Sequence, residues 1–332
     1  MSINDDALIW IDLEMDGLDL TKNFILEIAC IVTDFSLTNI HQGPDLVIHH
    51  SKSLLAAMGP WCMEHHTKSG LVQQVLNSQL SMFDAETEIM NFIEQVTLSS
   101  THKKRLILAG NSVYVDRYFL EKDMPRLNAS LDRSILDCST LKELIYRFNY
   151  QIACHAPIKG GNLHRALDDI RNSIKELKYY QKHALEEKQH IIQQVQYPLK
   201  TDVRAYLAWI EIKTTIIHCI LTDSNLNIID EIVDGKTNDD LMNFFHRNKI
   251  HRERTIVVAG MYLGPIRAHL KQLAPQFNEF CHYRSIDVDV ISVICEKWFP
   301  NIYIQRPLIN DDEEELKYSI ELLRFYRSSI FK

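Results

Sequence analysis

Residues 7–14, ALIWIDLE, decide how the fold is interpreted. The apolar run from Ala7 to Leu13 predicts a strand buried inside a sheet. Asp12 and Glu14 are two residues apart, so on a strand their side chains point to the same face. Two carboxylates on one face of a buried strand repel each other and lose hydration, and a divalent cation would remove that cost. The stretch therefore predicts a sheet with a metal site, and a solvated strand end is the simpler alternative.

Strand and helix signals continue from this stretch through the first half of the chain. Apolar runs predict strands at residues 25–33, 45–50 and 105–109, and amphipathic patterns predict helices at 67–79, 84–95, 116–124, 141–148 and 163–182. Strands come first, and strands and helices then alternate. This order predicts an α/β fold with a mixed sheet flanked by helices.

Length and charge limit the class of protein. The chain has 332 residues, which at roughly 150 residues per domain predicts about two domains. With 46% hydrophobic and 24% charged residues, the composition is that of a globular protein. The 36 basic and 44 acidic residues give a net charge of −8. This charge excludes a uniform electrostatic coat for duplex nucleic acid, but a short nucleic acid could still bind in a local pocket or through a metal ion.

The cysteines and the N-terminus indicate where the protein works. The seven cysteines stand singly, without a C-x-x-C pair, which predicts reduced thiols in an intracellular protein. The N-terminal residues MSINDDALIW lack the apolar core of a secretory signal. No run of 18 apolar residues predicts a membrane span. We therefore expect an intracellular, cytoplasmic protein with no membrane partner.

The second half of the sequence repeats the first. Five stretches recur in the same order, and only residues 50–84 have no counterpart. The paired stretches are 10–14 with 209–213, 91–92 with 243–244, 108–110 with 258–260, 133–135 with 284–286, and 173–177 with 319–323. The repeat predicts a tandem duplication. We expect a catalytic domain at residues 1–183, a linker helix at 184–203 and a degenerate copy at 204–332.

Three further residues extend the acidic pair. Asp116 opens a predicted helix after a turn at residues 110–112, and His164 and Asp169 lie five residues apart in the stretch HRALDD. Asp116 alone would be an ordinary helix-start acid, and His164 alone a surface or capping histidine. Together, four carboxylates and one histidine suit two Mg²⁺ or Mn²⁺ ions that grip a phosphate, with a base that deprotonates water.

With these residues, the sequence resembles the oligoribonuclease family of DEDDh 3′→5′ exoribonucleases. The resemblance covers about residues 7–182 and rests on LIWIDLEMDGLD, PWCMEHHTKSGL, LAGNSVYVDRYFL, STLKEL and HRALDDIRNSIKEL. It implies a ribonuclease-H-like fold and metal-dependent hydrolysis of very short RNAs, especially dinucleotides, to nucleoside 5′-monophosphates. It also implies roles for five residues. The metal ligands would be Asp12, Glu14, Asp116 and Asp169, and the general base would be His164.

The resemblance further implies a pocket for a short single-stranded RNA. Leu18 and Trp61 match residues that wedge against the bases, and the matching polar positions are His66, Ser112 and Ser139. Base stacking on an aromatic ring tolerates any sequence, although core packing is the simpler interpretation of Trp61 alone. Asp16 stands where the family usually has Thr, and we expect it to add negative charge beside the metal site.

The second half lacks this chemistry. By the internal alignment, the five positions of the DEDDh set hold Glu211, Lys213, Ile266, Asn310 and Glu315. A lysine and an apolar residue replace two metal ligands, and the base is missing. We therefore expect a catalytically inactive copy.

The second half nevertheless retains a motif that the first half has lost. In the family, the tyrosine and arginine of a His-Tyr-Arg motif reach the neighbouring protomer's active site. Here the motif stands at residues 282–284, whereas the aligned first-half residues are Asp-Arg-Ser at 132–134. We expect a monomeric pseudo-dimer in which Tyr283 and Arg284 complete one composite site. The alternative is that the motif survives for packing.

Two other functions compete with this prediction. One is a DEDDh exonuclease that acts on longer RNA or single-stranded DNA, and the other is a non-catalytic nucleotide-binding scaffold. An open basic channel would favour the first, and the acidic chain does not predict one. The complete acidic set with His164 argues against the second.

Overall fold

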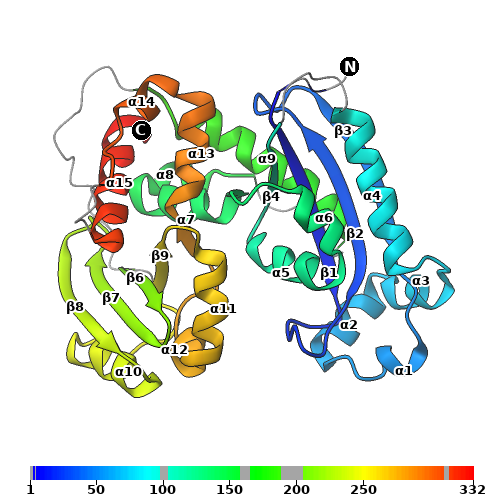
Figure 1. The fold of residues 1–332 in the computed structure, drawn as a ribbon, viewed down its shortest axis with the longest axis horizontal. Coiled ribbons are helices and arrows are strands. Elements are labelled where there is room, and N and C mark those ends of the chain that lie inside the picture. Colours follow the sequence, from blue (N-terminus) through cyan, green and yellow to red (C-terminus); the bar gives the residue numbers. More distant parts are fainter. Residues whose placement is uncertain (1–2, 4, 98–103, 158–164, 188–204, 310–313) are drawn as a thin grey trace. The chain divides into compact units, whose positions relative to one another are not determined.

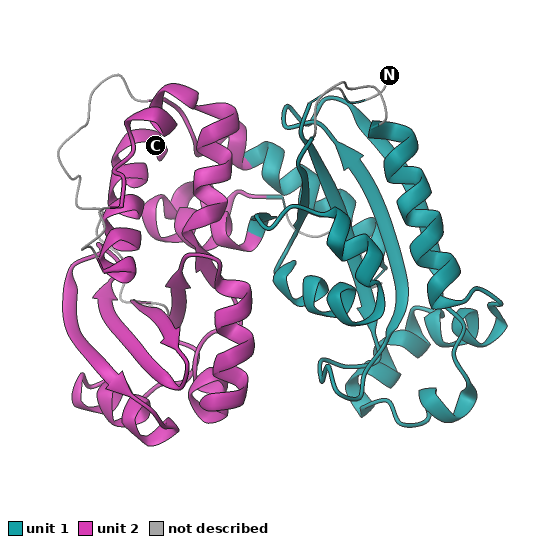
Figure 2. Ribbon diagram, in the orientation of Figure 1, with its two compact units in different colours: residues 1–138, 157–179 teal, residues 139–156, 180–332 magenta. Residues whose placement is uncertain are grey.

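The computed structural model describes residues 3–332 except for 4, 98–103, 158–164, 188–204 and 310–313. The chain forms two compact units (Figure 2). Unit 1 consists of Met1–Cys138 and Pro157–Tyr179, and unit 2 consists of Ser139–Ala156 and Tyr180–Lys332.

Unit 1 is built on a mixed five-stranded sheet in the order β3-β2-β1-β4-β5 (Figure 1). The strands are β1 (Ala7–Met15), β2 (Ile25–Thr33), β3 (Ile40–Val47), β4 (Leu106–Gly110) and β5 (Ile135–Asp137). β1 is antiparallel to β2 and parallel to β4. Every residue of β2 is buried, because β2 is an interior strand between β1 and β3. The sheet thus places β1, with its two acids, in the middle of the unit.

Helices surround this sheet. They are α1 (Lys52–Leu55), α2 (Pro60–Lys68), α3 (Leu71–Asn77), α4 (Met82–Thr97), α5 (Tyr114–Asp123), α6 (Pro125–Ser130) and the greater part of α9 (Ala166–His183). The single helix predicted at residues 67–79 is wrong. Gly70 adopts a left-handed φ of 79°, which residues inside a helix avoid, so the chain breaks into α2 and α3. The third strand was predicted at 45–50 but lies earlier, at Ile40–Val47.

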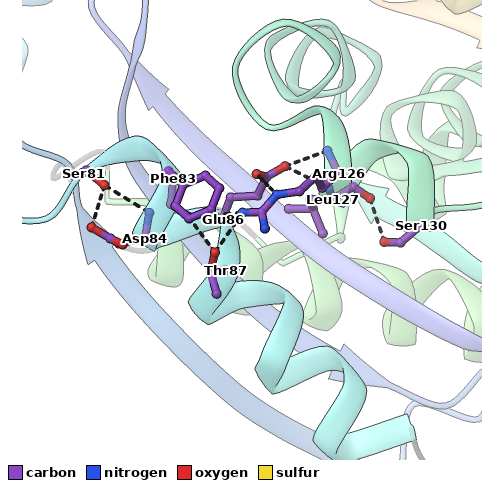
Figure 3. A network of polar contacts seen from close by, with 8 residues as sticks. All are labelled: Ser81, Phe83, Asp84, Glu86, Thr87, Arg126, Leu127 and Ser130. Carbon is purple, nitrogen blue, oxygen red and sulfur yellow. Dashed lines mark hydrogen bonds and ion pairs between the residues drawn. The ribbon is translucent and has the colours of Figure 1, made fainter.

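A buried carboxylate fixes α4 against α6 (Figure 3). Glu86 accepts hydrogen bonds from the backbone N–H groups of Arg126 and Leu127 at 2.7 and 3.0 Å. The Arg126 side chain also forms an ion pair with Glu86, at 2.7 Å between Nε and Oε2. An acid at the start of α6 satisfies amide groups that have no partner within the helix.

Unit 2 repeats the sheet topology, in the order β8-β7-β6-β9-β10. Its strands are β6 (Tyr206–Lys213), β7 (Ile216–Asp223), β8 (Ile228–Gly235), β9 (Ile256–Gly260) and β10 (Ser285–Asp287). Its helices are α7 (Cys138–Phe148), α8 (Tyr150–Cys154), α10 (Asn238–Arg247), α11 (Leu263–Leu273), α12 (Pro275–Phe280), α13 (Val288–Trp298), α14 (Pro300–Gln305) and α15 (Glu315–Ile330). The predicted α/β class, with two mixed sheets flanked by helices, is confirmed.

The two sheets also agree in detail. The Trp10 indole N–H donates to Thr33 Oγ1 at 2.9 Å, and the Trp209 indole N–H donates to Thr222 Oγ1 at 3.0 Å. In unit 2, β8 is followed directly by α10, without counterparts of α1 to α3. This matches the gap predicted opposite residues 50–84. The repeated topology is consistent with a duplication.

The predicted domain limits and the pseudo-dimer packing stay predictions. Residues 188–203 of the expected linker lie outside the described residues, and Leu185 forms a β-bridge with Phe331. Within unit 2, α7 lies against β10, because Thr140 Oγ1 accepts from the Asp287 N–H at 3.1 Å. Residues 139–156 of the first repeat thus group with the second.

Candidate active site

Three of the four predicted carboxylates lie together in unit 1. Asp12 and Glu14 extend from β1, and Asp169 lies in the first turn of α9. One oxygen from each carboxylate lies within 4.8 Å of the others. Asp116 is buried on α5, and its Oδ1 accepts the Leu13 N–H at 3.0 Å. Asp116, the fourth acid, is therefore hydrogen-bonded to β1 at Leu13, the residue between Asp12 and Glu14.

The electrostatics of this cluster suit a cation. Burial, followed by repulsion from Glu27, Asp169 and Asp116, raises the pKa of Glu14 from 4.5 to about 8. The raised pKa reflects burial first and the neighbouring carboxylates second, and Arg165 opposes part of the shift. Oxygen donors of this kind are those that Mg²⁺ and Mn²⁺ prefer. The residues present therefore fit the metal ions that the sequence predicts.

Sequence reasoning missed two residues beside the cluster. Glu27 lies opposite Glu14 on β2 and is completely buried. Arg165, at the start of α9, forms an ion pair with Glu27 at 2.6 Å between Nη2 and Oε1. A signal was present, since Glu27 is the one charged residue in the apolar run ILEIACIVT, and a fully buried acid is rarely left unpaired.

The base-contacting candidates differ in exposure. Leu18 and Trp61 are each 61% exposed, so the core-packing interpretation of Trp61 is wrong. The Trp61 ring stacks on His65 with 4.0 Å between centroids. His66 is buried, and its Nε2 lies 2.9 Å from the Met15 carbonyl oxygen at the end of β1. An exposed aromatic ring on a helix anchored to the acidic strand can contact a base.

The two serines belong to different units. Ser112 has a left-handed φ of 55°, and its N–H donates to Asp137 Oδ1 at 2.8 Å. Ser139 is buried at the start of α7, in unit 2. Asp16, the departure from the family, is also buried, and its Oδ1 accepts the Phe24 N–H at 2.6 Å. Asp16 therefore helps to close the β1–β2 connection.

The other three predicted residues do not belong to the described part of unit 1. His164 is outside the described residues. Tyr283 is 54% exposed in unit 2. Arg284 forms an ion pair with the fully buried Glu143, at 3.0 Å between Nη1 and Oε1, and its N–H donates to His282 Nδ1 at 3.1 Å. Part of the Arg284 guanidinium is thus bound within unit 2.

One of the two matching strand positions in unit 2 holds a cation, Lys213. Lys213 forms an ion pair with Glu211 at 3.0 Å. A second group that could hold a metal comprises His218, Glu231 and Glu314, but Lys317 lies 2.8 Å from Glu314. Lysine ammonium groups therefore lie beside acids in unit 2, and the inactivity of this copy stays a prediction.

Comparison with known proteins identifies the class. The sequence model of the exonuclease (RNase T) family matches residues 9–177. The chain belongs to this exonuclease family, and the prediction of a nuclease that hydrolyses phosphodiester bonds is confirmed.

Individual relatives are more specific. The chain is 47% identical over 175 residues to the oligoribonuclease of Arabidopsis thaliana, covering 53% of this chain and 77% of that protein. It is 46% identical over 173 residues to a probable oligoribonuclease of Dictyostelium discoideum, covering 52% and 87%. The resemblance to oligoribonucleases is thereby confirmed. A structure of E. coli exonuclease I in complex with a dT13 oligonucleotide matches with a TM-score of 0.41 and 14% identity, over 54% of this chain and 41% of that one.

Two further findings concern the cysteines and the helices. All seven cysteines are free thiols, and five of them are buried. Among the helices that the structure describes, none is long and apolar enough to cross a membrane.

Proposed function

We propose that this chain is a metal-dependent 3′→5′ exoribonuclease that hydrolyses short oligoribonucleotides, especially dinucleotides, to nucleoside 5′-monophosphates. The observation that carries the proposal is the convergence of Asp12, Glu14 and Asp169, with Asp116 attached to the same strand. The oligoribonuclease relatives support the substrate class. We further propose that it acts inside the cell, in the cytoplasm.

The four carboxylates would hold two Mg²⁺ or Mn²⁺ ions. Such ions, when bound, stabilise charge on the phosphate and lower the pKa of a coordinated water. The protein would supply the carboxylates that attract them, and a bound cation would offset the burial and repulsion that raise the pKa of Glu14. His164 would take the proton from the attacking water.

The substrate side of the proposal rests on exposed and polar groups. Leu18 and Trp61 would contact the bases, because both side chains are largely exposed. The polar groups that would hold the short chain are His66, Ser112 and Ser139. Tyr283 and Arg284 would complete the site by base stacking and phosphate pairing, which makes the monomeric chain a functional pseudo-dimer.

A product time course tests the proposal. Synthetic RNAs of two, five and twenty nucleotides are incubated with the full chain in Mg²⁺ or Mn²⁺, and mononucleotides are quantified. We expect the dinucleotide to be hydrolysed fastest. Faster hydrolysis of the twenty-nucleotide RNA or of single-stranded DNA would contradict the short-substrate assignment. Metal-independent binding without hydrolysis would indicate a scaffold. A light-scattering mass of one chain is expected, and a two-chain mass would contradict the monomer.

A further inference from the structure

The pair Glu27–Arg165 lies beside the acidic cluster but has no assigned role. Glu27 faces Glu14 across the β1–β2 ladder, and directly opposed side chains share one face of a sheet. Its carboxylate is completely buried. A buried acid that faces Glu14 and lies beside Asp45 is unfavourable unless a cation is fixed against it.

Arg165 provides that cation in a fixed geometry. Its Nε lies 2.9 and 3.2 Å from the two oxygens of Glu27, and its Nη2 lies 2.6 Å from Oε1. A planar guanidinium that grips a carboxylate at more than one point fixes direction as well as charge. Because Glu27 belongs to a wholly buried strand, the position of Arg165 is set by the core of the sheet.

The backbone of Arg165 extends this constraint to a proposed metal ligand. The Arg165 carbonyl oxygen accepts the N–H groups of Asp168 and Asp169, both at 3.1 Å. These bonds form the first turn of α9. A continuous series of contacts therefore runs from β2, through the ion pair and the Arg165 carbonyl, to the backbone of Asp169.

Unit 2 shows that the sheet does not need this pair. Lys213 and Ile216 occupy the rung of β6 and β7 that corresponds to Glu14 and Glu27. In the sequence, Asp311 stands at the position of Arg165. Both members are therefore replaced in the copy that has lost the catalytic set, although the strand order is kept.

We propose that Glu27 and Arg165 are positioning residues, which hold the first turn of α9 so that Asp169 meets Asp12 and Glu14 before a metal ion binds. The inference rests on the proposed function, because it assigns the pair to the site at which that function places the metals. Neither residue is a catalytic residue, since they act through Asp169.

The test compares Glu27→Gln, Arg165→Gln and Arg165→Lys with the unchanged full chain. Mn²⁺ affinity is measured by calorimetry, and backbone exchange of the first turn of α9 is measured in metal-free protein. We expect Glu27→Gln and Arg165→Gln to weaken Mn²⁺ binding about 10–100-fold, the usual effect of removing a group that orients a metal ligand. Exchange at Asp169 should become faster, while the KM for a dinucleotide at saturating Mn²⁺ changes less than about twofold.

Arg165→Lys separates geometry from charge. Lysine keeps the positive charge but lacks the rigid fork, so its Mn²⁺ affinity should lie between those of the unchanged chain and Arg165→Gln. If Glu27→Gln does not fold, the two Arg165 variants still decide the matter, because Arg165 is partly exposed.

Arg171→Gln is the matched control. Arg171 lies on the same helix and forms an exposed ion pair with Asp168 at 2.9 Å, so its loss should leave Mn²⁺ affinity unchanged. Unaltered Mn²⁺ affinity and exchange in the Glu27 and Arg165 variants would overturn the positioning role. An unchanged chain that hydrolyses nothing with either metal would instead overturn the proposed function, so the two failures can be told apart.

Discussion

The sheets of unit 1 and unit 2 have the same strand order. They differ in the charges of one pair of residues that face each other on adjacent antiparallel strands. In unit 1, β1 and β2 place Glu14 opposite Glu27, whereas β6 and β7 place Lys213 opposite Ile216. In unit 1, burial and then the nearby acids raise the pKa of Glu14 to about 8. Unit 2 pairs Glu211 with a lysine instead. The difference shows that the sheet tolerates either arrangement, so the crowded carboxylates of unit 1 are not required by the strand order.

The largest expected difference between the units is in catalysis. Asp12→Ala removes a proposed metal ligand and should reduce dinucleotide hydrolysis about 10³-fold, because a metal contributes several kcal/mol of charge stabilisation. Glu211→Ala, at the matching position of unit 2, should leave the rate unchanged. Initial rates of mononucleotide release measure both variants. Equal losses in the two would contradict the inactive second copy.

Tyr283→Ala tests whether unit 2 contributes to the reaction. The substitution removes a stacking partner of a base, worth roughly 1–3 kcal/mol. We therefore expect it to lower kcat/KM about 5–150-fold. Tyr150→Ala removes another exposed aromatic residue of the same unit and is the control. Turnover near that of the unchanged chain, with the fold intact by circular dichroism, would show that residues 282–284 survive for packing.

Metal binding should protect unit 1 selectively. At Mn²⁺ concentrations about 100 times the dissociation constant, a ligand stabilises the state that binds it by about 2.7 kcal/mol. Hydrogen exchange should therefore slow about 100-fold in unit 1 segments that open only by global unfolding of that unit. Exchange in β6 and β7 should not change. Equal protection of both units would mean that unit 2 also binds metal or unfolds together with unit 1.

A smaller effect should follow from pH. Because the pKa of Glu14 is raised in the folded protein, the folded state binds its proton more tightly than the unfolded state does. The free energy of unfolding of the metal-free protein should therefore fall as pH rises from about 4.5 to about 8. Glu14→Gln should flatten this dependence. Urea unfolding across this range measures it, and an identical slope in the variant would assign the dependence to other groups.

The acidic cluster could be predicted because its carboxylates lie in local patterns. The apolar run around Asp12 and the stretch HRALDD around Asp169 are each visible within a few residues. The lone charge of Glu27 in its apolar run was visible, but its contact with Arg165 could not be predicted, because the two residues are 138 positions apart. The break at Gly70 was missed because a single glycine does not always interrupt a helix. The grouping of residues 139–156 with unit 2 depends on tertiary packing, which periodicity does not record.

The matched tryptophans have a practical consequence. Trp10 and Trp209 are both fully buried, bond to a threonine in the same way, and lie at equivalent places in their sheets. Trp10 precedes Asp12 by two residues, whereas Trp209 precedes Glu211 by two. A variant that keeps only one of these two tryptophans would carry a fluorescent reporter in a similar buried environment. In one variant the reporter is close to the acidic cluster, and in the other it is close to the Glu211–Lys213 ion pair. The molecule thus contains its own reference signal for spectroscopic titrations.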